Sequence, residues 1–350
     1  MSEPLLMQIL ERRYQAGPVR CVLVAHGEKD VFHVQRSLEA DWIARIYPVT
    51  ALAPARDRVL ALANLLVFLE QHQYPAERVV RTVDGSLTAR SEQWHMVVTT
   101  YLGSSLQAWQ PASTAGTTLT SLDAAHAMHD PQLLSQIGAL LGQLHALDAT
   151  GPAAEQMISP GLQAATELAW ASSELARLQP RVPAHLQDEY AQLTTRIQQV
   201  RRFDECPQTI IHGDCHLGNV VGTPTHGYSF VDWEAAGRGA AVTDLGLLLS
   251  SSLDLADDTP NRAIIHAIID GYAAHRRLSR IEQDLLADAI CFRILVTLAG
   301  AYEQRCRPDY QPTQFFWGST YAAWEQHEQQ ATRIARIAQE RIQALVSAGE

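Results

Sequence analysis

The chain has 350 residues, of which 47% are hydrophobic, so it is long enough to bury a core in each of about two domains. Its 27 basic and 38 acidic residues give a formal net charge of −11, whereas nucleic-acid-binding proteins usually present a basic face to the phosphates. Composition therefore disfavours a nucleic-acid partner and excludes both a disordered chain and a small disulfide-stapled scaffold.

Five scattered cysteines include no CxxC pair, so neither a disulfide framework nor a thiolate zinc site is indicated. The N-terminal residues lack the basic region of a signal peptide, and no window offers the ~18 apolar residues that a membrane span needs. We therefore expect a soluble, cytoplasmic protein with no membrane partner.

The first hundred residues predict a sheet with helices. Apolar residues at helical spacing predict a short helix over 3–14. Three β-rich runs predict a meander over 19–47, and residues 57–72 are apolar almost all round, as in a buried helix. Two more strands, near 78–83 and 94–102, complete a predicted five-stranded sheet.

Beyond Gly103, the stretch QPASTAGTTLTS marks a loop, after which helical periodicity dominates. The predicted helices span 132–148, 161–178, 183–203, 240–252, 260–277, 279–305 and 315–346. One polar island, residues 209–239, interrupts them with short strands around polar loops. Catalytic groups often lie on loops held by a rigid scaffold, so we expect the chemistry there.

Four polar residues of this island, His212, Asp214, Asn219 and Asp232, suit phosphoryl transfer. A hydroxyl that attacks a nucleotide γ-phosphate needs a carboxylate to orient it and accept its proton, and magnesium prefers carboxylate, amide and phosphate oxygens. Asp214 fits the first task, and Asn219 and Asp232 fit the second. The five-residue step from Asp214 to Asn219 equals that in the H-R-D-x-x-x-x-N loop of protein kinases.

Residues 211–246, IHGDCHLGNV…FVDWEAAGRGAAVTDLG, closely resemble the aminoglycoside phosphotransferase family of small-molecule kinases. Three further segments are similar to that family: HGEKDVFHV at 26–34, WIARIYP at 42–48 and IGALLGQLHAL at 137–147. The motifs are specific for the fold and the catalytic class, but they do not name the acceptor.

The resemblance implies an α+β, bilobal protein-kinase-like fold. A five-stranded antiparallel N-terminal lobe, residues 1–102, would bind the nucleotide, ATP or GTP. A mainly helical C-terminal lobe, residues 103–350, would hold the catalytic loop at 210–219 and a metal-binding segment at 230–246. The implied reaction moves the γ-phosphate of a Mg²⁺-bound nucleotide to a hydroxyl of an aminoglycoside-, amino alcohol- or sugar-like molecule.

Carried over position by position, the resemblance makes Asp214 the catalytic carboxylate and Asn219 and Asp232 the magnesium ligands. His212 and Asp244 would then be structural braces inside the loop. Cys215, in the same loop, is interpreted as a structural thiol because no thiolate-activating partner can be named.

The nucleotide-binding residues are also implied by the resemblance. Arg45 would grip the α/β-phosphates, although an ordinary solvent-facing arginine is the alternative. Gly27 is the only glycine of the predicted phosphate-covering hairpin, so Lys29 is expected to add a cation. The base would contact the connector Thr99–Leu102, which includes Thr100, Tyr101 and Leu102, unless that stretch makes ordinary strand hydrogen bonds.

One departure from the family pattern concerns Arg45. A glutamate of the following helix commonly pairs with this cation, yet no acidic residue lies between Asp57 and Glu70, and those two are weak substitutes. The usual ion pair is therefore in doubt. Together with the single glycine of the predicted hairpin, this motivates an alternative function, a degenerate kinase that acts as a nucleotide-binding regulatory module.

Other readings remain open. His212, Asp214 and His216 also fit the ligands of a metal-dependent hydrolase. Glu234 shares a face with Asp232 in an extended segment, so it could contact metal, substrate or solvent. The aromatic run FFWGSTYAAW, residues 315–324, is interpreted as core. The net charge, with the acids Asp257, Asp258, Glu303 and Glu325, predicts a cationic or zwitterionic acceptor.

Overall fold

The computed structural model describes residues 1–27, 29–37, 39–49, 56–103, 130–148, 164–200, 203–223, 227–252, 261–308 and 324–349. The chain divides into two compact units. The first unit comprises Met1–Ser105, Ala149–Ser159 and Val220–Glu234, and the second comprises Leu106–Asp148, Pro160–Asn219 and Ala235–Glu350. The predicted boundary at residue 102 stays a prediction, and Val220–Glu234 groups with the N-terminal residues.

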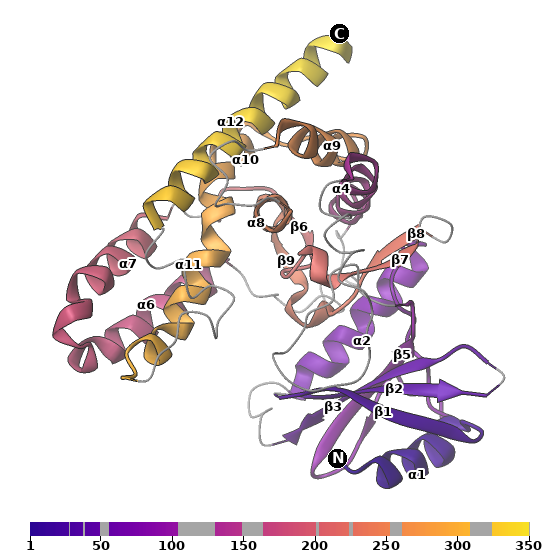
Figure 1. Cartoon of the computed structure of the whole chain (residues 1–350). Coiled ribbons are helices and arrows are strands. Elements are labelled where there is room, and N and C mark those ends of the chain that lie inside the picture. Colours follow the sequence, from indigo (N-terminus) through magenta and orange to yellow (C-terminus); the bar gives the residue numbers. More distant parts are fainter. Residues whose placement is uncertain are drawn as a thin grey trace. The chain divides into compact units, whose positions relative to one another are not determined.

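The first unit is built on an antiparallel five-stranded sheet in the order β1-β2-β3-β5-β4 (Figure 1). The strands are β1 (Val19–His26), β2 (Asp30–Arg36), β3 (Trp42–Pro48), β4 (Ala89–Arg90) and β5 (Trp94–Thr100). The predicted five-stranded antiparallel sheet is confirmed.

The strand predicted near 78–83 is wrong, because the fourth strand of the sheet is β4. Val79 forms only an isolated bridge with Thr99, and the amide of Val80 donates to the carbonyl of Val98 at 2.8 Å. The chain then turns at Thr82–Gly85, where Gly85 has φ +83°, so the pairing stops after a few residues.

Helix α1 (Glu3–Tyr14) covers one face of the sheet with its apolar stripe of Leu6, Leu10 and Tyr14. Ala44 and Ile46 of β3 lie in this core. Side chains alternate between the two faces of a strand, so Arg45, between them, projects from the opposite face. Helix α2 (Arg56–Gln71) packs against β5 and buries most of its length, as its nearly uniform apolar sequence predicts.

The segment Val220–Glu234 adds a small antiparallel hairpin to the first unit, β7 (Val220–Thr223) and β8 (Gly227–Phe230). Ala76, just after α2, forms a parallel bridge with Phe230, and the rings of Tyr74 and Trp233 meet edge to face at 5.9 Å. These contacts fix the chain on both sides of Asp232 to the N-terminal part of the unit.

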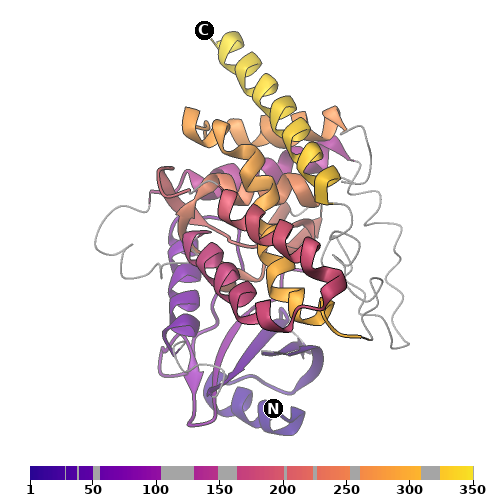
Figure 2. The same cartoon turned by 90° about the vertical axis from the view of Figure 1, so that its left-hand side faces the viewer.

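The second unit is mainly helical and contains one short antiparallel pair, β6 (Gln208–Ile211) and β9 (Gly237–Ala240). Its α-helices are α4 (Pro131–His145), α6 (Ala164–Leu178), α7 (Gln187–Gln199), α8 (Ala241–Ser251), α9 (Arg262–Ala273), α10 (Arg280–Asp284), α11 (Leu286–Arg305) and α12 (Trp324–Gly349). Short 3₁₀ turns are η2 (Gln179–Arg181), η3 (Ala184–Leu186), η4 (Leu217–Asn219) and η5 (Trp233–Ala235). Figures 1 and 2 show α6 and α7 side by side.

Most predicted helices are present in the part of the chain that the structure describes. One predicted helix needs a correction, and two predicted segments lie outside the described residues. The predicted helix 279–305 is two helices, α10 and α11. A capping box of Ser279 and Glu282 begins α10, which ends at Asp284, and Leu285 is both its C-cap and the N-cap of α11. The predicted loop after Gly103 and most of the aromatic run 315–324 lie outside the described residues. None of the described helices has the length and apolarity to cross a membrane.

Candidate active site

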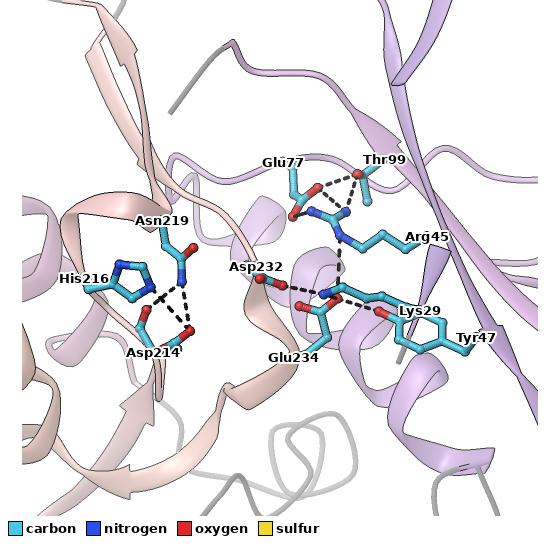
Figure 3. Close-up of polar contacts among 10 residues, drawn as sticks. All are labelled: Lys29, Arg45, Tyr47, Glu77, Thr99, Asp214, His216, Asn219, Asp232 and Glu234. Atoms are coloured by element: carbon cyan, nitrogen blue, oxygen red, sulfur yellow. Dashed lines mark hydrogen bonds and ion pairs between the residues drawn. The ribbon is translucent and has the colours of Figure 1, made fainter. Parts of the chain in front are cut away.

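Asp214 lies on the loop between β6 and η4, in the second unit (Figure 3). The side-chain nitrogen of Asn219, Nδ2, donates to the backbone oxygen of Asp214 at 2.9 Å and to the Asp214 Oδ2 at 3.1 Å. The Asn219 side chain thus offers its oxygen, rather than its nitrogen, to a cation. Sequence spacing placed these two residues correctly relative to each other.

His216 holds the Asp214 carboxylate in its ionised form. Its Nδ1 accepts from the amide of Gly218 at 3.0 Å, so the proton is on Nε2, which lies 3.7 Å from Asp214 Oδ2. Burial raises the pKa of Asp214, but the neighbouring side chains of His216, His212 and Arg293 lower it by more, so the net pKa is below the ordinary value. Asp214 is therefore a hydrogen-bond acceptor at neutral pH.

Asp244, on the first turn of α8, organises the backbone before Asp214. Its Oδ2 accepts from the amide of His212 at 2.6 Å, and its Oδ1 accepts from the amide of Gly213 at 2.9 Å. Nε2 of His145, on α4, lies 3.2 Å from the same Oδ2 of Asp244. All of these side chains are buried, and the role of His212 and Asp244 as braces stays a prediction. Burial lowers the pKa of His145, which stays neutral.

Cys215 is also buried, and its thiol donates to the backbone oxygen of Asp244 at 2.9 Å. Burial raises its pKa, so the group is an inert thiol, as its surroundings in sequence indicated. The hydrolase reading gains no support, because no group of three or more His, Cys, Asp or Glu in the described ranges could hold a metal ion.

In the first unit, Asp232 and Glu234 face the side chain of Lys29 (Figure 3). Lys29 Nζ lies 2.7 Å from Asp232 Oδ1 and also donates to Glu234 Oε1. The Tyr47 hydroxyl donates to the same Glu234 oxygen at 2.5 Å, and Arg45 Nε is 3.6 Å from it. Two carboxylates and two cations thus meet on one side of the sheet.

The two carboxylates respond differently to this environment. Burial raises the pKa of Asp232, but the hydrogen bond with Glu234 and the charge of Lys29 lower it below the ordinary value. Burial raises the pKa of Glu234, and the hydrogen bond and charge of Asp232 raise it more. Asp232 has φ +68°, a conformation that Asp and Asn tolerate better than other residues with a side chain.

Arg45 has the ion-pair partner that the sequence did not reveal. Its NH1 and NH2 donate to Glu77 at 2.7 and 3.0 Å, and Thr99 Oγ1 also donates to Glu77. The sequence left the partner of Arg45 open because this partner follows α2 instead of lying within it. The carbonyl of Leu69 accepts from the amide of Tyr74 at 2.9 Å, and this turn carries the chain back to the sheet at Glu77.

Of the two weak substitutes, only the Glu70 side chain belongs to the described residues, and no ion pair with Arg45 is found for it there. Glu70 is exposed, and the Asp57 side chain lies outside the described residues. Because Glu77 pairs with Arg45, the degenerate-kinase alternative keeps only one of its two supports, the single glycine of the predicted hairpin. The signal for Glu77 was an acid in QYPAERVV directly after an apolar helix, but the pattern alone did not show where that stretch would lie.

The residues present fit a magnesium-bound nucleotide. Magnesium usually takes one or two protein carboxylates and completes its shell with phosphate oxygens and water. Asp232 and Glu234 supply such carboxylates in the first unit, and no donor from the part of the chain that the structure describes reaches the buried Oε2 of Glu234. In the second unit, Asn219 supplies an amide oxygen. Lys29 and Arg45 supply positive charge for phosphates.

The other residues predicted to contact the nucleotide are Thr100, Tyr101, Leu102 and Gly27. The amides of Thr100 and Tyr101 donate to the carbonyls of Arg78 and Asp41, both at 2.9 Å, so a base would have to use other atoms of these residues. The Tyr101 ring stacks on His33 at 4.4 Å, Leu102 follows it, and Gly27 has open space where a Cβ would stand.

The acids cited for a cationic acceptor contribute little on the described surface. Glu303 is bound by Arg177, at 3.0 Å, and by Arg181. Asp257 and Asp258, together with the Glu325 side chain, lie outside the described residues.

Comparison with known proteins places these sites in a family. The model of the phosphotransferase enzyme family matches residues 21–278. Stress response kinase A of Escherichia coli (strain K12) is 28% identical over 130 residues, which are 37% of each chain. Homoserine kinase of Neisseria meningitidis serogroup B is 30% identical over 148 residues, which are 42% of this chain and 45% of that protein. The matched stretch is less than half of either relative.

Solved structures share the fold over nearly the whole chain. An amicoumacin kinase bound to AMP-PNP and Ca²⁺ has a TM-score of 0.65 at 13% identity and covers 95% of this chain and 94% of its own. Spectinomycin phosphotransferase bound to ADP and spectinomycin has a TM-score of 0.63 at 9% identity, with coverage of 97% and 98%. The predicted kinase-like fold class is confirmed, and with the family match over residues 21–278, the chain belongs to the phosphotransferase enzyme family.

Proposed function

We propose that this protein transfers the γ-phosphate of a magnesium-bound nucleoside triphosphate, ATP or GTP, to a hydroxyl group of a small molecule. The observation that carries the proposal is the Asp214 carboxylate, which Asn219 and His216 hold ionised on the loop after β6. Support comes from the family match and from structural neighbours that hold AMP-PNP or ADP.

Each unit supplies one part of the reaction. In the first unit, Arg45 and Lys29 bind phosphates, while Asp232 and Glu234 bind the metal. In the second unit, Asp214 orients the acceptor hydroxyl, and Asn219 offers a metal ligand. When bound, magnesium neutralises charge on the β- and γ-phosphate oxygens.

Asp214 acts late on the proton. An ordinary aspartate has a pKa near ~3.9 and a hydroxyl near ~15.7, so removing the proton before attack would cost roughly 16 kcal/mol at ~1.36 kcal/mol per unit. The lowered pKa of Asp214 makes that removal still less favourable. The carboxylate therefore positions the hydroxyl and accepts its proton as the bond to phosphorus forms.

For the acceptor, we propose an amino alcohol first and an aminoglycoside or a sugar second. The relative with the highest identity among those compared above is named a homoserine kinase, and a further structural neighbour is named an aminopropanol kinase, at 18% identity and a TM-score of 0.54. Both names describe a hydroxyl on a small molecule that also carries an amine.

A nucleotide-consumption screen tests the proposal. ATP or GTP with Mg²⁺ is offered with panels of amino alcohols, aminoglycosides, sugars and nucleosides. We expect consumption that depends on one acceptor class and disappears in Asp214→Asn. Acceptor-dependent consumption that persists in Asp214→Asn would contradict the proposed site, and nucleotide binding without consumption for every class would favour a regulatory module.

A further inference from the structure

A partly buried ion pair in the second unit reaches the catalytic loop from outside the kinase motifs. Arg293 of α11 donates through NH1 to Glu167 of α6 at 2.6 Å, and through NH2 to the carbonyl of Gly213 at 2.5 Å. Glu167 is 5% exposed, and the Arg293 side chain is 20% exposed. One guanidinium therefore joins two helices to the residue that directly precedes Asp214.

The bond from Arg293 completes the restraint on one peptide group. The carbonyl of Gly213 and the amide of Asp214 belong to the same planar unit. Arg293 donates to the Gly213 oxygen of this unit, and the Asp214 N–H of the same unit donates to His212 Nδ1 at 3.3 Å. Asp244 already holds the preceding amide, that of Gly213, at 2.9 Å. With both ends of this plane bound, the direction in which the Asp214 side chain leaves the backbone is set.

The loop has little freedom to find another position. Gly213 has φ +79°, and a Cβ there would lie 2.3 Å from the carbonyl oxygen of Ala235. The backbone therefore passes close to Ala235 in a conformation that favours glycine. A loop packed this tightly transmits a shift of the Gly213 carbonyl directly to Asp214.

A contribution to folding stability does not by itself explain the Arg293–Glu167 ion pair. Burying an ion pair costs desolvation that its Coulomb attraction often does not repay. Moreover, Glu167 Oε2 and Arg293 Nε are buried and find no hydrogen-bond partner among the described residues, so the pair is imperfectly satisfied there. Its geometry does give one benefit, a rigid planar fork whose two separate nitrogens reach the carboxylate and the loop carbonyl from fixed positions, which the single nitrogen of a lysine does not reproduce.

We propose that Arg293 is a positioning residue for phosphoryl transfer, which sets the orientation of Asp214 through the Gly213 carbonyl, and that Glu167 in turn orients Arg293. The proposal rests on the proposed function for its catalytic consequence. The catalytic loop is held from three elements: α8 through Asp244, α11 through Arg293, and α6 through Glu167.

The test variant is Arg293→Lys, which keeps the positive charge near Asp214 but lacks the rigid two-nitrogen fork that holds Glu167 and the Gly213 carbonyl together. The matched control is Arg305→Lys. Arg305 also lies on α11 and pairs with a glutamate of a neighbouring helix, Glu189 of α7, at 3.1 Å. Control and test thus change the same residue type, on the same helix, in the same kind of interhelical ion pair.

Hydrogen–deuterium exchange of the full-length protein gives a readout that needs no acceptor. We expect the peptide covering 208–219 to exchange about tenfold faster in Arg293→Lys than in wild type or Arg305→Lys. The melting temperatures of the two variants should agree. Equal loop exchange in the two variants would overturn the proposal, as would a general rise in exchange throughout α6 and α11.

Kinetics with ATP, Mg²⁺ and the acceptor class that the screen identifies give the second readout. We expect kcat to fall about 10²-fold in Arg293→Lys with nearly unchanged KM for nucleotide, because a misplacement of ~1 Å can cost that much. A kcat equal to that of Arg305→Lys would overturn the proposal. If wild type consumed no nucleotide with any acceptor, the proposed function would fail, whereas loop exchange would still decide whether Arg293 holds the loop.

Discussion

Asp214 combines a lowered pKa with two hydrogen bonds from one asparagine, an arrangement that suits a positioned acceptor of a proton. We expect Asp214→Asn to lower phosphoryl transfer by about 10²- to 10⁴-fold, the range typical of general acid–base groups. The melting temperature and the nucleotide affinity should stay near the wild-type values, because the carboxylate acts on the acceptor.

The matched control is Asp130→Asn. Asp130 caps α4 by accepting from the amides of Gln132 and Leu133, and asparagine caps helices equally well. Steady-state rates of both variants with one acceptor provide the check. Activity of Asp214→Asn within about tenfold of Asp130→Asn would argue against the assigned role.

The Arg45–Glu77 pair gives a prediction on stability. Both residues are buried, so Glu77→Gln removes the carboxylate that binds the buried guanidinium and leaves only the more distant Glu234, 3.6 Å from Nε, as a counter-charge. Breaking a buried pair in this way typically costs about 3–5 kcal/mol. Urea unfolding should therefore show a much lower midpoint for Glu77→Gln.

Glu303→Gln serves as the control, because Glu303 makes its ion pairs with Arg177 and Arg181 at the exposed surface, where such pairs contribute little. Its urea midpoint should stay close to that of wild type. Equal midpoints for the Glu77 and Glu303 variants would show that the pair does not stabilise the first unit.

How far the sequence predicts single residues depends on how local their restraints are. Asp214 and Asn219 are five residues apart on one loop, so the spacing alone placed them together. Glu77 lies 32 residues from Arg45, and Arg293 lies 80 residues from Gly213, so only the packing of separate elements brings each pair together. Neither pair follows a periodic pattern that a single sequence could reveal.

At the scale of elements, α4 and α9 approach so closely that glycines are required. A Cβ on Gly271 would lie 1.9 Å from the carbonyl oxygen of Ser135, and one on Gly138 would lie 2.3 Å from that of Ile268. We expect Gly271→Ala to destabilise the protein by at least about 1–3 kcal/mol, because the helices must move apart.

Thermal unfolding checks this against Gly17→Ala, since a Cβ on Gly17 would meet nothing within 4 Å. Similar melting temperatures for the two variants would mean that α4 and α9 are less tightly packed than these distances indicate.

Helices were predicted better than strands because their apolar periodicity extends over many residues, as in α9 and α4. Strand β4 has only two residues, too few for an alternating pattern, while residues 78–83 have the composition of a strand but make only isolated backbone bonds to β5. The break at Leu285 was missed because the apolar pattern continues from α10 into α11.

At the scale of the whole molecule, the motifs predicted the family and the fold class because both depend on a short, highly constrained set of residues. The grouping of Val220–Glu234 with the first unit was not predicted, since a hairpin of four-residue strands carries no signal of which part it packs against. The acceptor is set by side chains that the common fold does not constrain, so the same motifs serve several acceptor classes.

The central claim is that this chain binds a nucleotide through a magnesium ion held by Asp232. Isothermal calorimetry with ATP or GTP, with and without Mg²⁺, tests it most directly in wild type, Asp232→Asn and the control Asp130→Asn. Asparagine suits φ +68°, so Asp232→Asn removes the charge without straining the backbone. We expect Mg²⁺ to strengthen binding in wild type and control but not in Asp232→Asn, whose metal-free binding should persist through Arg45 and Lys29. A full magnesium effect in Asp232→Asn, or none in wild type, would contradict the account.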